Sequence, residues 1–360
     1  MPSILSIDAG RRSAAIAIAR SLCILGVVYV HAWTGIGSAQ LAALRGTGQE
    51  ALRWILMEAL GRSAVPLLGL ISGWLVASSA RSLHWGPFVR RKARSILLPM
   101  ILWNALAILL VSGSAWLWSL PAPVPSSWEW VAQELFILTR NPDINVQMPF
   151  LRDLFLCMVV APFLVRLPAA ALLALAGLAG AAHIAGWGPP VLMRASILCF
   201  FLLGMAAWRW GWADRAAAWP FWMAAAPFAL AMPVRLALAL QWGPPQDNAV
   251  VAAVDLVSRV AAALFFWRLA WALVPTQAGS LLRRIEPFAF FLFCAHLILI
   301  WLGGPLVGRI VGRMGSPLYP LFLLLQPVLI LLAVVPMASM LGRLSPRAAA
   351  LLSGGRLGRR

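Results

Sequence analysis

Residues 14–36 read AAIAIARSLCILGVVYVHAWTGI, and this stretch decides the fold because it is long enough and apolar enough to cross a lipid bilayer. The rest of the chain has the same character, with 62% hydrophobic and only 11% charged residues. A typical soluble domain carries about 25% charged residues. Too few polar side chains are therefore available to cover a surface that faces water, and the sequence predicts an integral membrane protein.

Further apolar runs follow along the chain, separated by breaks rich in glycine and proline such as residues 121–125 (PAPVP). At roughly 20 residues per span, 360 residues leave room for about ten spans and for no separate soluble domain. We therefore predict an all-α, polytopic transmembrane helix bundle in which residues 1–360 form one membrane-embedded domain. The predicted spans cover residues 14–36, 54–79, 95–118, 148–166, 169–187, 190–211, 219–240, 249–273, 287–306 and 318–341.

The positions of the basic residues predict the topology. A net charge of +18 would suit a nucleic-acid-binding protein, but the Lys and Arg residues lie mainly at the ends of spans, which is typical of membrane proteins. If the N-terminus is cytoplasmic, 19 of the 29 Lys and Arg residues lie on the cytoplasmic side, five lie outside and five lie within spans. We therefore predict cytoplasmic N- and C-termini and no nucleic-acid partner.

Two polar residues in the first span are the most informative. Arg20 and His31 are eleven residues apart, close to three helical turns, so both project from one face about 16 Å apart along the axis. This spacing puts Arg20 near the inner interface and His31 about half a membrane deeper. A charge at the bilayer centre costs about 2.5–3.5 kcal/mol, so such residues usually face a cavity or a partner. His31 is a candidate general base. An equally weighted alternative is a histidine that only hydrogen-bonds a neighbouring helix.

A basic cluster over residues 90–94 (RRKAR) precedes the third predicted span. Arg91 and Arg94 are three residues apart and share a helical face, and the start of the span would add unpaired N–H groups and a partial positive charge. Together with Arg90, they are candidates to hold a phosphate or pyrophosphate. The alternative is ordinary positive-inside anchoring or contact with anionic lipid.

Other charges inside the spans suggest local ion pairs. Glu58 and Arg62 are four residues apart, as are Asp255 and Arg259. Structural pairing is the default interpretation of these charges, although paired charges also line substrate cavities.

Four further charged residues lack an obvious partner. Arg152 and Asp153 are adjacent and should therefore point apart, so each needs its own partner elsewhere. Arg194, like Arg235, has no acidic residue within reach in its own span. The four cysteines occur singly in apolar runs with no metal-ligand spacing, so no metal site is predicted.

Several stretches, in this order, resemble the acyltransferase-3 family of polytopic membrane O-acyltransferases. The Arg20-x10-His31 pair looks like the family's hallmark in its first span. Residues 62–73 (RSAVPLLGLISG) are similar to its VPLFF-x-x-SG stretch, with Leu68-Gly69 in place of the usual aromatic pair. Arg91-x-x-Arg94 before Leu98-Pro99 looks like its basic RxxR motif.

The resemblance continues to the ninth predicted span. Residues 150–154 (FLRDL) resemble the family's WFLRDL stretch. Residues 288–296 (FAFFLFCAH), which end at His296, resemble its S-Y-x-I-Y-L-x-H stretch but lack the serine and tyrosine.

The resemblance implies a membrane O-acyltransferase of the bacterial inner membrane. Such an enzyme would transfer an acyl group, often acetyl and sometimes succinyl, from cytoplasmic acyl-CoA to a hydroxyl of a carbohydrate, glycolipid or exopolysaccharide precursor, without a permanently bound cofactor. His31 would act as general base or as a covalent acyl relay, Arg20 would contribute to the catalytic cavity, and Arg90, Arg91 and Arg94 would bind the acyl-CoA phosphates. The predicted substrate-cavity residues are Arg62, Ser72, Arg152, Asp153, Arg194 and His296.

A second class of function remains open at this stage, a transporter or flippase for a glycan or lipid precursor that uses the same charges without chemistry. The sequence also leaves open the acceptor, the acyl chain, and whether the protein is a monomer or a homodimer.

Overall fold

The fold is helical throughout the part of the chain that this computed structural model describes, which comprises residues 9–62, 64–188, 190–242 and 248–357. The predicted all-α architecture is confirmed. Seven helical segments in these ranges are long and apolar enough to cross a membrane. They are α1 (Ala9–Val30); Gly48–Ala77, made of α3 (Gly48–Ile55), η1 (Leu56–Gly61) and α4 (Ala64–Ala77); Trp85–Trp118, made of α5 (Trp85–Lys92), η3 (Ala93–Leu97), α6 (Leu98–Ala107), η4 (Ile108–Ser112) and α7 (Gly113–Trp118); α13 (Phe221–Trp242); α14 (Ala249–Leu273); α15 (Gln277–Val311); and α16 (Tyr319–Leu344).

The remaining predicted spans coincide with shorter or bent helices. An eighth span is counted if α11 (Ala195–Trp210) and α12 (Trp212–Ala218), which meet at 80°, cross the membrane as one unit. Helices α9 (Pro149–Leu164) and α10 (Ala169–Ile184) have 16 residues each, about 24 Å, which is less than the ~30 Å of a typical hydrocarbon core. By length and composition the structure therefore supports seven or eight spans, fewer than the predicted count of about ten. The other helical elements are α2 (Ser38–Ala43), η2 (Ala80–Leu83), α8 (Trp128–Phe136) and α17 (Pro346–Leu352).

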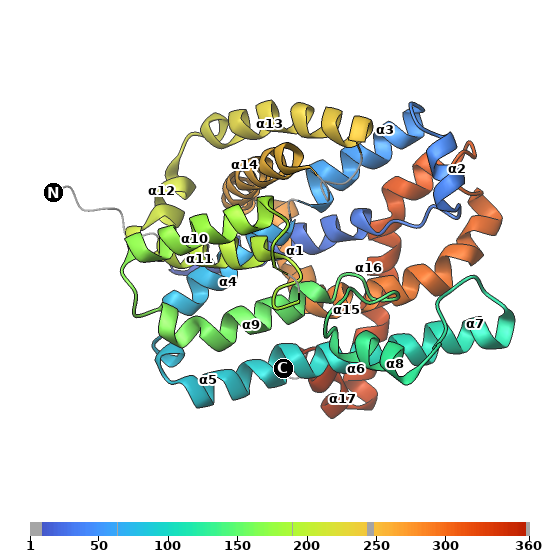
Figure 1. The fold of residues 1–360 in the computed structure, drawn as a ribbon, viewed down its shortest axis with the longest axis horizontal. Coiled ribbons are helices and arrows are strands. Elements are labelled where there is room, and N and C mark those ends of the chain that lie inside the picture. Colours follow the sequence, from blue (N-terminus) through green and yellow to red (C-terminus); the bar gives the residue numbers. More distant parts are fainter. Residues whose placement is uncertain (1–8, 63, 189, 243–247, 358–360) are drawn as a thin grey trace.

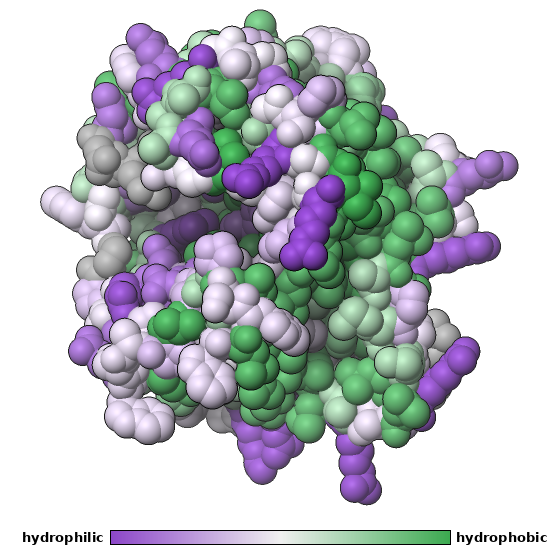
Figure 2. Space-filling view, turned by 90° about the vertical axis from the view of Figure 1, so that its right-hand side faces the viewer, coloured by the Kyte–Doolittle hydropathy of each residue, from purple (hydrophilic) through white to green (hydrophobic). Residues whose placement is uncertain are grey.

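Helix α1 lies in the middle of the bundle (Figure 1), where it packs against α4, α14, α15 and α16. In this view α13 and α14 lie above α1, and the helices from α5 to α7 run along the lower edge. Seen from the side that carries α2 and α7, the surface has a broad hydrophobic area on the right (Figure 2). Such a surface suits contact with lipid.

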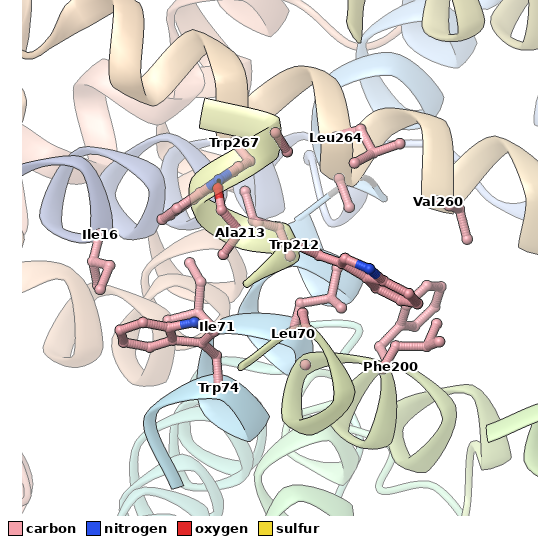
Figure 3. A pocket seen from close by; sticks show the side chains of 16 residues that line it. Ile16, Leu70, Ile71, Trp74, Phe200, Trp212, Ala213, Val260, Leu264 and Trp267 are labelled. Atoms are coloured by element: carbon pink, nitrogen blue, oxygen red, sulfur yellow. Dashed lines mark hydrogen bonds between the residues drawn. The ribbon is translucent and has the colours of Figure 1, made fainter. Parts of the chain in front are cut away.

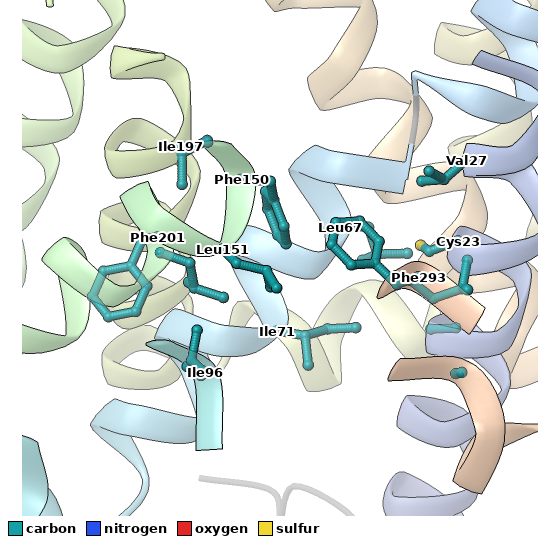
Figure 4. Packing of buried hydrophobic residues seen from close by; sticks show 14 of the residues in the cluster. Cys23, Val27, Leu67, Ile71, Ile96, Phe150, Leu151, Ile197, Phe201 and Phe293 are labelled. Atoms are coloured by element: carbon teal, nitrogen blue, oxygen red, sulfur yellow. The ribbon is translucent and has the colours of Figure 1, made fainter. Parts of the chain in front are cut away.

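Helices α4 and α11 approach each other closely because glycine occupies their crossing. A Cβ at Gly73 would lie 1.9 Å from the carbonyl oxygen of Phe201, and a Cβ at Gly204 would lie 2.1 Å from that of Leu70. Small residues that let two backbones approach are the usual interface residues of membrane helices, where apolar side chains gain little from leaving lipid. Next to this crossing, large apolar side chains from α1, α4, α9, α11 and α15 fill the interior (Figure 4).

The first helix ends earlier than predicted, at Val30 rather than Ile36. Beyond it, the backbone groups of Trp33 bond to α16 instead of continuing the helix: its N–H donates to Gln326 Oε1 at 3.0 Å, and its carbonyl accepts from the Tyr319 hydroxyl at 3.1 Å. The Trp33 ring also lies where side chains at Gly304 and Gly308 would otherwise stand. His31 therefore directly follows the C-terminal end of α1 and does not lie within it.

Candidate active site

Two histidine rings meet at the centre of the site. The centroids of the His31 and His296 rings are 5.5 Å apart, and His296 is completely buried on α15. Its Nδ1 lies 2.8 Å from the carbonyl oxygen of Phe293 and 3.2 Å from that of Leu292. Because a carbonyl oxygen only accepts, Nδ1 must carry the proton, which leaves Nε2 as an acceptor. This buried Nε2 has no hydrogen-bond partner in the part of the chain that the structure describes.

The His31 ring is the accessible member of the pair. His31 is half-buried, and its ring makes no hydrogen bond to the described residues. His31 is therefore the more exposed member of the pair, and His296 is fully buried beside it. The sequence predicted both residues for the site, and the structure brings them together.

A cavity of about 150 Å³ lies between α1, α4, α5, α9 and α15. Its apolar part includes Phe150 and Phe293, whose ring centroids are 5.8 Å apart. The Phe293 ring is in turn 6.1 Å from that of His296, so one wall of the cavity contacts the histidine pair. Ser72, one of the predicted cavity residues, also lines it.

The rest of the cavity lining is charged. The side chains concerned are Arg20, Lys92, Glu286 and Arg356. Arg20 donates to Glu286 at 3.1 Å, so the lining holds three cations and one carboxylate, which is paired with Arg20. Arg20 thus belongs to this charged part of the cavity, away from the His31 ring.

Arg356 was missed as a site residue by the sequence reasoning, which counted it only among the basic residues of the C-terminus. Its guanidinium lies 3.9 Å from the centroid of the Phe290 ring and donates to the carbonyl oxygens of Ser95 and Ser353. Desolvation, with a smaller effect of the Arg20 charge, lowers the pKa of Arg356 to about 10, so it remains charged at neutral pH. No sequence signal distinguished this arginine from its neighbours.

The predicted basic cluster divides into two groups. Arg90, Arg91 and Arg94 are exposed, whereas Lys92 is half-buried and lines the cavity. The prediction that a helix begins beside this cluster is wrong: α5 begins at Trp85 and continues through η3 into α6. The Ala93 N–H, for instance, bonds to the carbonyls of Arg90 and Val89, so no free N–H groups of a helix start face a ligand there.

A separate network of buried ion pairs connects residues of three helical segments. Glu58 pairs with Arg62 at 3.3 Å and Asp255 pairs with Arg259, which confirms both predicted i, i+4 pairs. Arg235, which has no partner in its own helix, joins them by bonding Glu58 at 3.2 Å and Asp255 at 3.1 Å. The network therefore ties together η1, α13 and α14.

Arg152 and Asp153 behave differently from the prediction that they point apart. The Arg152 guanidinium turns back to Asp153 at 2.8 Å and also donates to the carbonyls of Leu138, Pro190 and Val191. Asp153 accepts from the backbone N–H groups of Met193 and Arg194, which lead into α11. The flexible arginine side chain makes this adjacent pairing feasible, and the pair fixes the loop before α11.

Comparison with known proteins agrees with this geometry. A family model described as an acyltransferase domain, that of acyltransferase-3, matches residues 13–340. The chain belongs to the acyltransferase-3 family. The succinoglycan biosynthesis protein ExoH of Rhizobium meliloti (strain 1021) is 30% identical over 365 residues, which cover 96% of this chain and 93% of that protein. No solved structure matches the chain significantly.

As a member of the acyltransferase-3 family, the protein is a multi-pass membrane enzyme that transfers acyl groups other than aminoacyl groups. The family match runs from α1 to α16 and thus includes both histidines and most of the charged cavity lining. Arg356 lies beyond it.

A second, larger cavity of about 300 Å³ lies between α1, α4, α11, α12 and α14 (Figure 3). Trp74, Trp212 and Trp267 point toward it, and the Trp267 indole donates to the carbonyl of Ala213. Its lining is apolar and contains no titratable side chain. This cavity therefore offers no group for acid–base chemistry, in contrast to the histidine pair.

Proposed function

We propose that this acyltransferase moves an acyl group, by expectation acetyl, from acyl-CoA to a hydroxyl of a carbohydrate in a polysaccharide or its lipid-linked precursor. The observation that carries the proposal is a cavity with a cationic lining and an apolar wall that includes Phe293, whose ring lies against His296 of the histidine pair. A carbohydrate acceptor is supported by the name of the similar protein ExoH, which concerns succinoglycan biosynthesis.

The charged part of the cavity suits the phosphates of coenzyme A. Arg20, Lys92 and Arg356 outnumber Glu286 by two charges, and guanidinium and ammonium groups are the usual phosphate ligands of proteins. The exposed side chains of Arg90, Arg91 and Arg94 extend the positive charge outside the cavity. The pantetheine arm would then lie along the apolar part, with the thioester at the histidines.

The histidine pair supplies acid–base chemistry for the transfer. His31 would accept the proton of the acceptor hydroxyl as its oxygen attacks the thioester carbonyl, and would return that proton to the departing coenzyme A thiolate. His296, with its proton fixed on Nδ1, would offer Nε2 as a hydrogen-bond acceptor that orients the His31 ring or the hydroxyl. The other route is a covalent relay, in which the acyl group rests on His31 before it reaches the acceptor.

We further propose an inner-membrane location with cytoplasmic N- and C-termini and about ten crossings, in which α9, α10 and the bent α11–α12 unit also cross. The charge asymmetry of the sequence supports this topology. A cytoplasmic N-terminal side would give the donor cavity access to cellular acyl-CoA.

The direct test uses membranes that contain the protein, incubated with labelled acetyl-CoA. We expect release of coenzyme A and transfer of label to endogenous or added glycan, both absent from membranes that carry His31→Ala. Label that stays entirely on coenzyme A, with acetyl-, succinyl- and longer acyl-CoA donors alike, would overturn the proposal.

A further inference from the structure

The ion-pair network beside His31 carries more positive than negative charge. Glu58 and Asp255 together hold three arginines, Arg62, Arg235 and Arg259, through four ion pairs. The network therefore has one uncompensated positive charge. Excess charge at this depth is costly unless something balances it.

Arg194 adds a second uncompensated charge. Its backbone N–H donates to Asp153, but its guanidinium makes no ion pair or hydrogen bond with the described residues. The guanidinium interacts electrostatically with Arg259 and Asp255, and both Arg194 and Arg62 interact with the His31 ring. Arg194 is exposed, so a ligand can approach it. Four arginines thus face two carboxylates next to the catalytic histidine.

The network itself encloses little free space. The polar cavity among its side chains has only about 10 Å³, room for a single water, and Arg62 and Arg259 line it together with Arg235 and Ser258. Arg235 Nη1 and Ser258 Oγ are both buried and without partners among the described residues. An incoming anion is too large for this cavity and would bind at the partly exposed guanidinium groups of Arg62 and Arg259 and at the exposed Arg194.

A further polar group lies near the network. His183 Nε2 is buried without a hydrogen-bond partner among the described residues, and the ring interacts electrostatically with Arg259 and Arg194. A polar ligand would thus find an unsatisfied nitrogen beside the arginines.

We propose that Arg194, with Arg62 and Arg259, forms a carboxylate-binding site that holds an acidic group of the substrate beside His31. Guanidinium groups bind planar carboxylates through paired N–H donors, and such a group would balance one of the two uncompensated positive charges. That the acidic group lies beside the reacting atoms rests on the proposed function, in which His31 is the reacting centre. The carboxylate has two sources, the far end of a dicarboxylic acyl group or an acidic sugar of the acceptor.

Binding can be tested without turnover. Thermal unfolding of the purified full-length protein is measured with succinate and with its neutral diamide, succinamide. We expect stabilisation by succinate only, lost in Arg194→Gln, retained in part in Arg194→Lys, and retained fully in the matched exposed variant Arg313→Gln. Equal stabilisation of wild type and Arg194→Gln by succinate would overturn the site, whether or not the protein transfers acyl groups.

Turnover then separates the two sources. Butyryl-CoA has the same acyl chain length as succinyl-CoA but lacks its carboxylate. The ratio of kcat/KM for succinyl-CoA to that for butyryl-CoA therefore shows whether the bound carboxylate belongs to the acyl group. The same ratio for an acidic glycan against its carboxyl-reduced form reports an acceptor source. We expect Arg194→Gln to lower one of these ratios at least tenfold, because the arginine binds only the charged member of that pair of substrates. If both ratios are unchanged, the arginines serve only the fold.

If no donor supports transfer by wild type, the proposed function fails. The succinate result still decides whether the carboxylate site exists.

Discussion

At the scale of the residue, the decisive feature is how each imidazole is held. His296 is locked by two backbone carbonyls, so its tautomer is fixed by geometry alone. His31 has no such partner, directly follows the end of a helix and is only half-buried. A fixed acceptor next to a free ring is the arrangement expected of an acid–base pair, since one member orients what the other exchanges protons with.

The first prediction concerns His31. We expect His31→Ala to leave expression and folding nearly intact, because the ring is not a large packing element, and to reduce acyl transfer by at least ~10²–10⁴-fold as expected for a lost general base. A covalent relay would lose essentially all transfer. His31→Gln keeps hydrogen bonding but cannot take up the proton, so near-normal transfer by this variant, measured with labelled acyl-CoA, would leave His31 as a structural contact only.

His296 provides the comparison within the pair. Its motif in the sequence is a weaker match, which predicts a smaller defect than for His31. Its burial and its unpaired Nε2 now lead us to expect that His296→Ala also lowers kcat, by ~10-fold or more, whereas His296→Gln recovers part of the loss because an amide oxygen can replace the acceptor. Equal activity of both variants would remove the orienting role.

The second prediction separates the two groups of the basic cluster. Lys92→Gln should weaken binding of coenzyme A by about 1.5–3 kcal/mol, as expected for a charge-assisted bond in a partly enclosed cavity. The double variant Arg91→Ala/Arg94→Ala should weaken it less, because exposed ion pairs contribute only ~0–1 kcal/mol. Calorimetry on the purified protein measures both. The exposed Arg166→Gln serves as control, and an effect of the same size there would mean that only net charge matters.

For the individual helices, the sequence predicts that a helix exists better than it predicts where the helix ends or which segments it contacts. Hydropathy is a property of each segment, so every predicted apolar run coincides with a helix. The end of α1 depends on Trp33 binding to α16, nearly 300 residues away, and the pairing of Arg235 depends on η1 and α14. Arg356 enters the cavity lined by Arg20 and Lys92 only because α17 packs beside α6. Such contacts between distant segments have no local signature.

The third prediction concerns the crossing of α4 and α11. Gly73→Ala would place a methyl group 1.9 Å from a backbone oxygen, so the helices must separate, and overpacking of this kind costs about 1–3 kcal/mol. We expect a lower midpoint of thermal unfolding for the purified protein. Gly177→Ala on α10 is the matched control, because no atom lies within 4 Å of its added Cβ. If both variants unfold at the same temperature, the close approach of the two helices contributes nothing to stability.

At the scale of the whole molecule, the open question is the number of crossings. Arg356 of the C-terminal segment lines the same cavity as Arg20 of α1 and Lys92 of α5. An even number of crossings returns the C-terminus to the side of the N-terminus, where such a shared cavity forms without a long connection. Eight and ten crossings both satisfy this condition, and seven do not.

The last prediction distinguishes these counts by reporter fusions at three positions. All three counts put residue 130, which follows the third span, outside. Residue 166 lies between α9 and α10, so it is cytoplasmic if the 16-residue helix α9 crosses, as in the ten-span count, and outside if neither helix crosses. The C-terminus is cytoplasmic for eight or ten crossings and outside for seven. We expect cytoplasmic signals at residue 166 and at the C-terminus, since Arg166 follows the positive-inside rule and a bilayer can thin around a short helix at modest cost. A fusion at residue 166 that is active only outside would leave α9 and α10 as helices that do not cross, and the donor cavity, which α9 helps to line, would then have one wall that stays on the outer side.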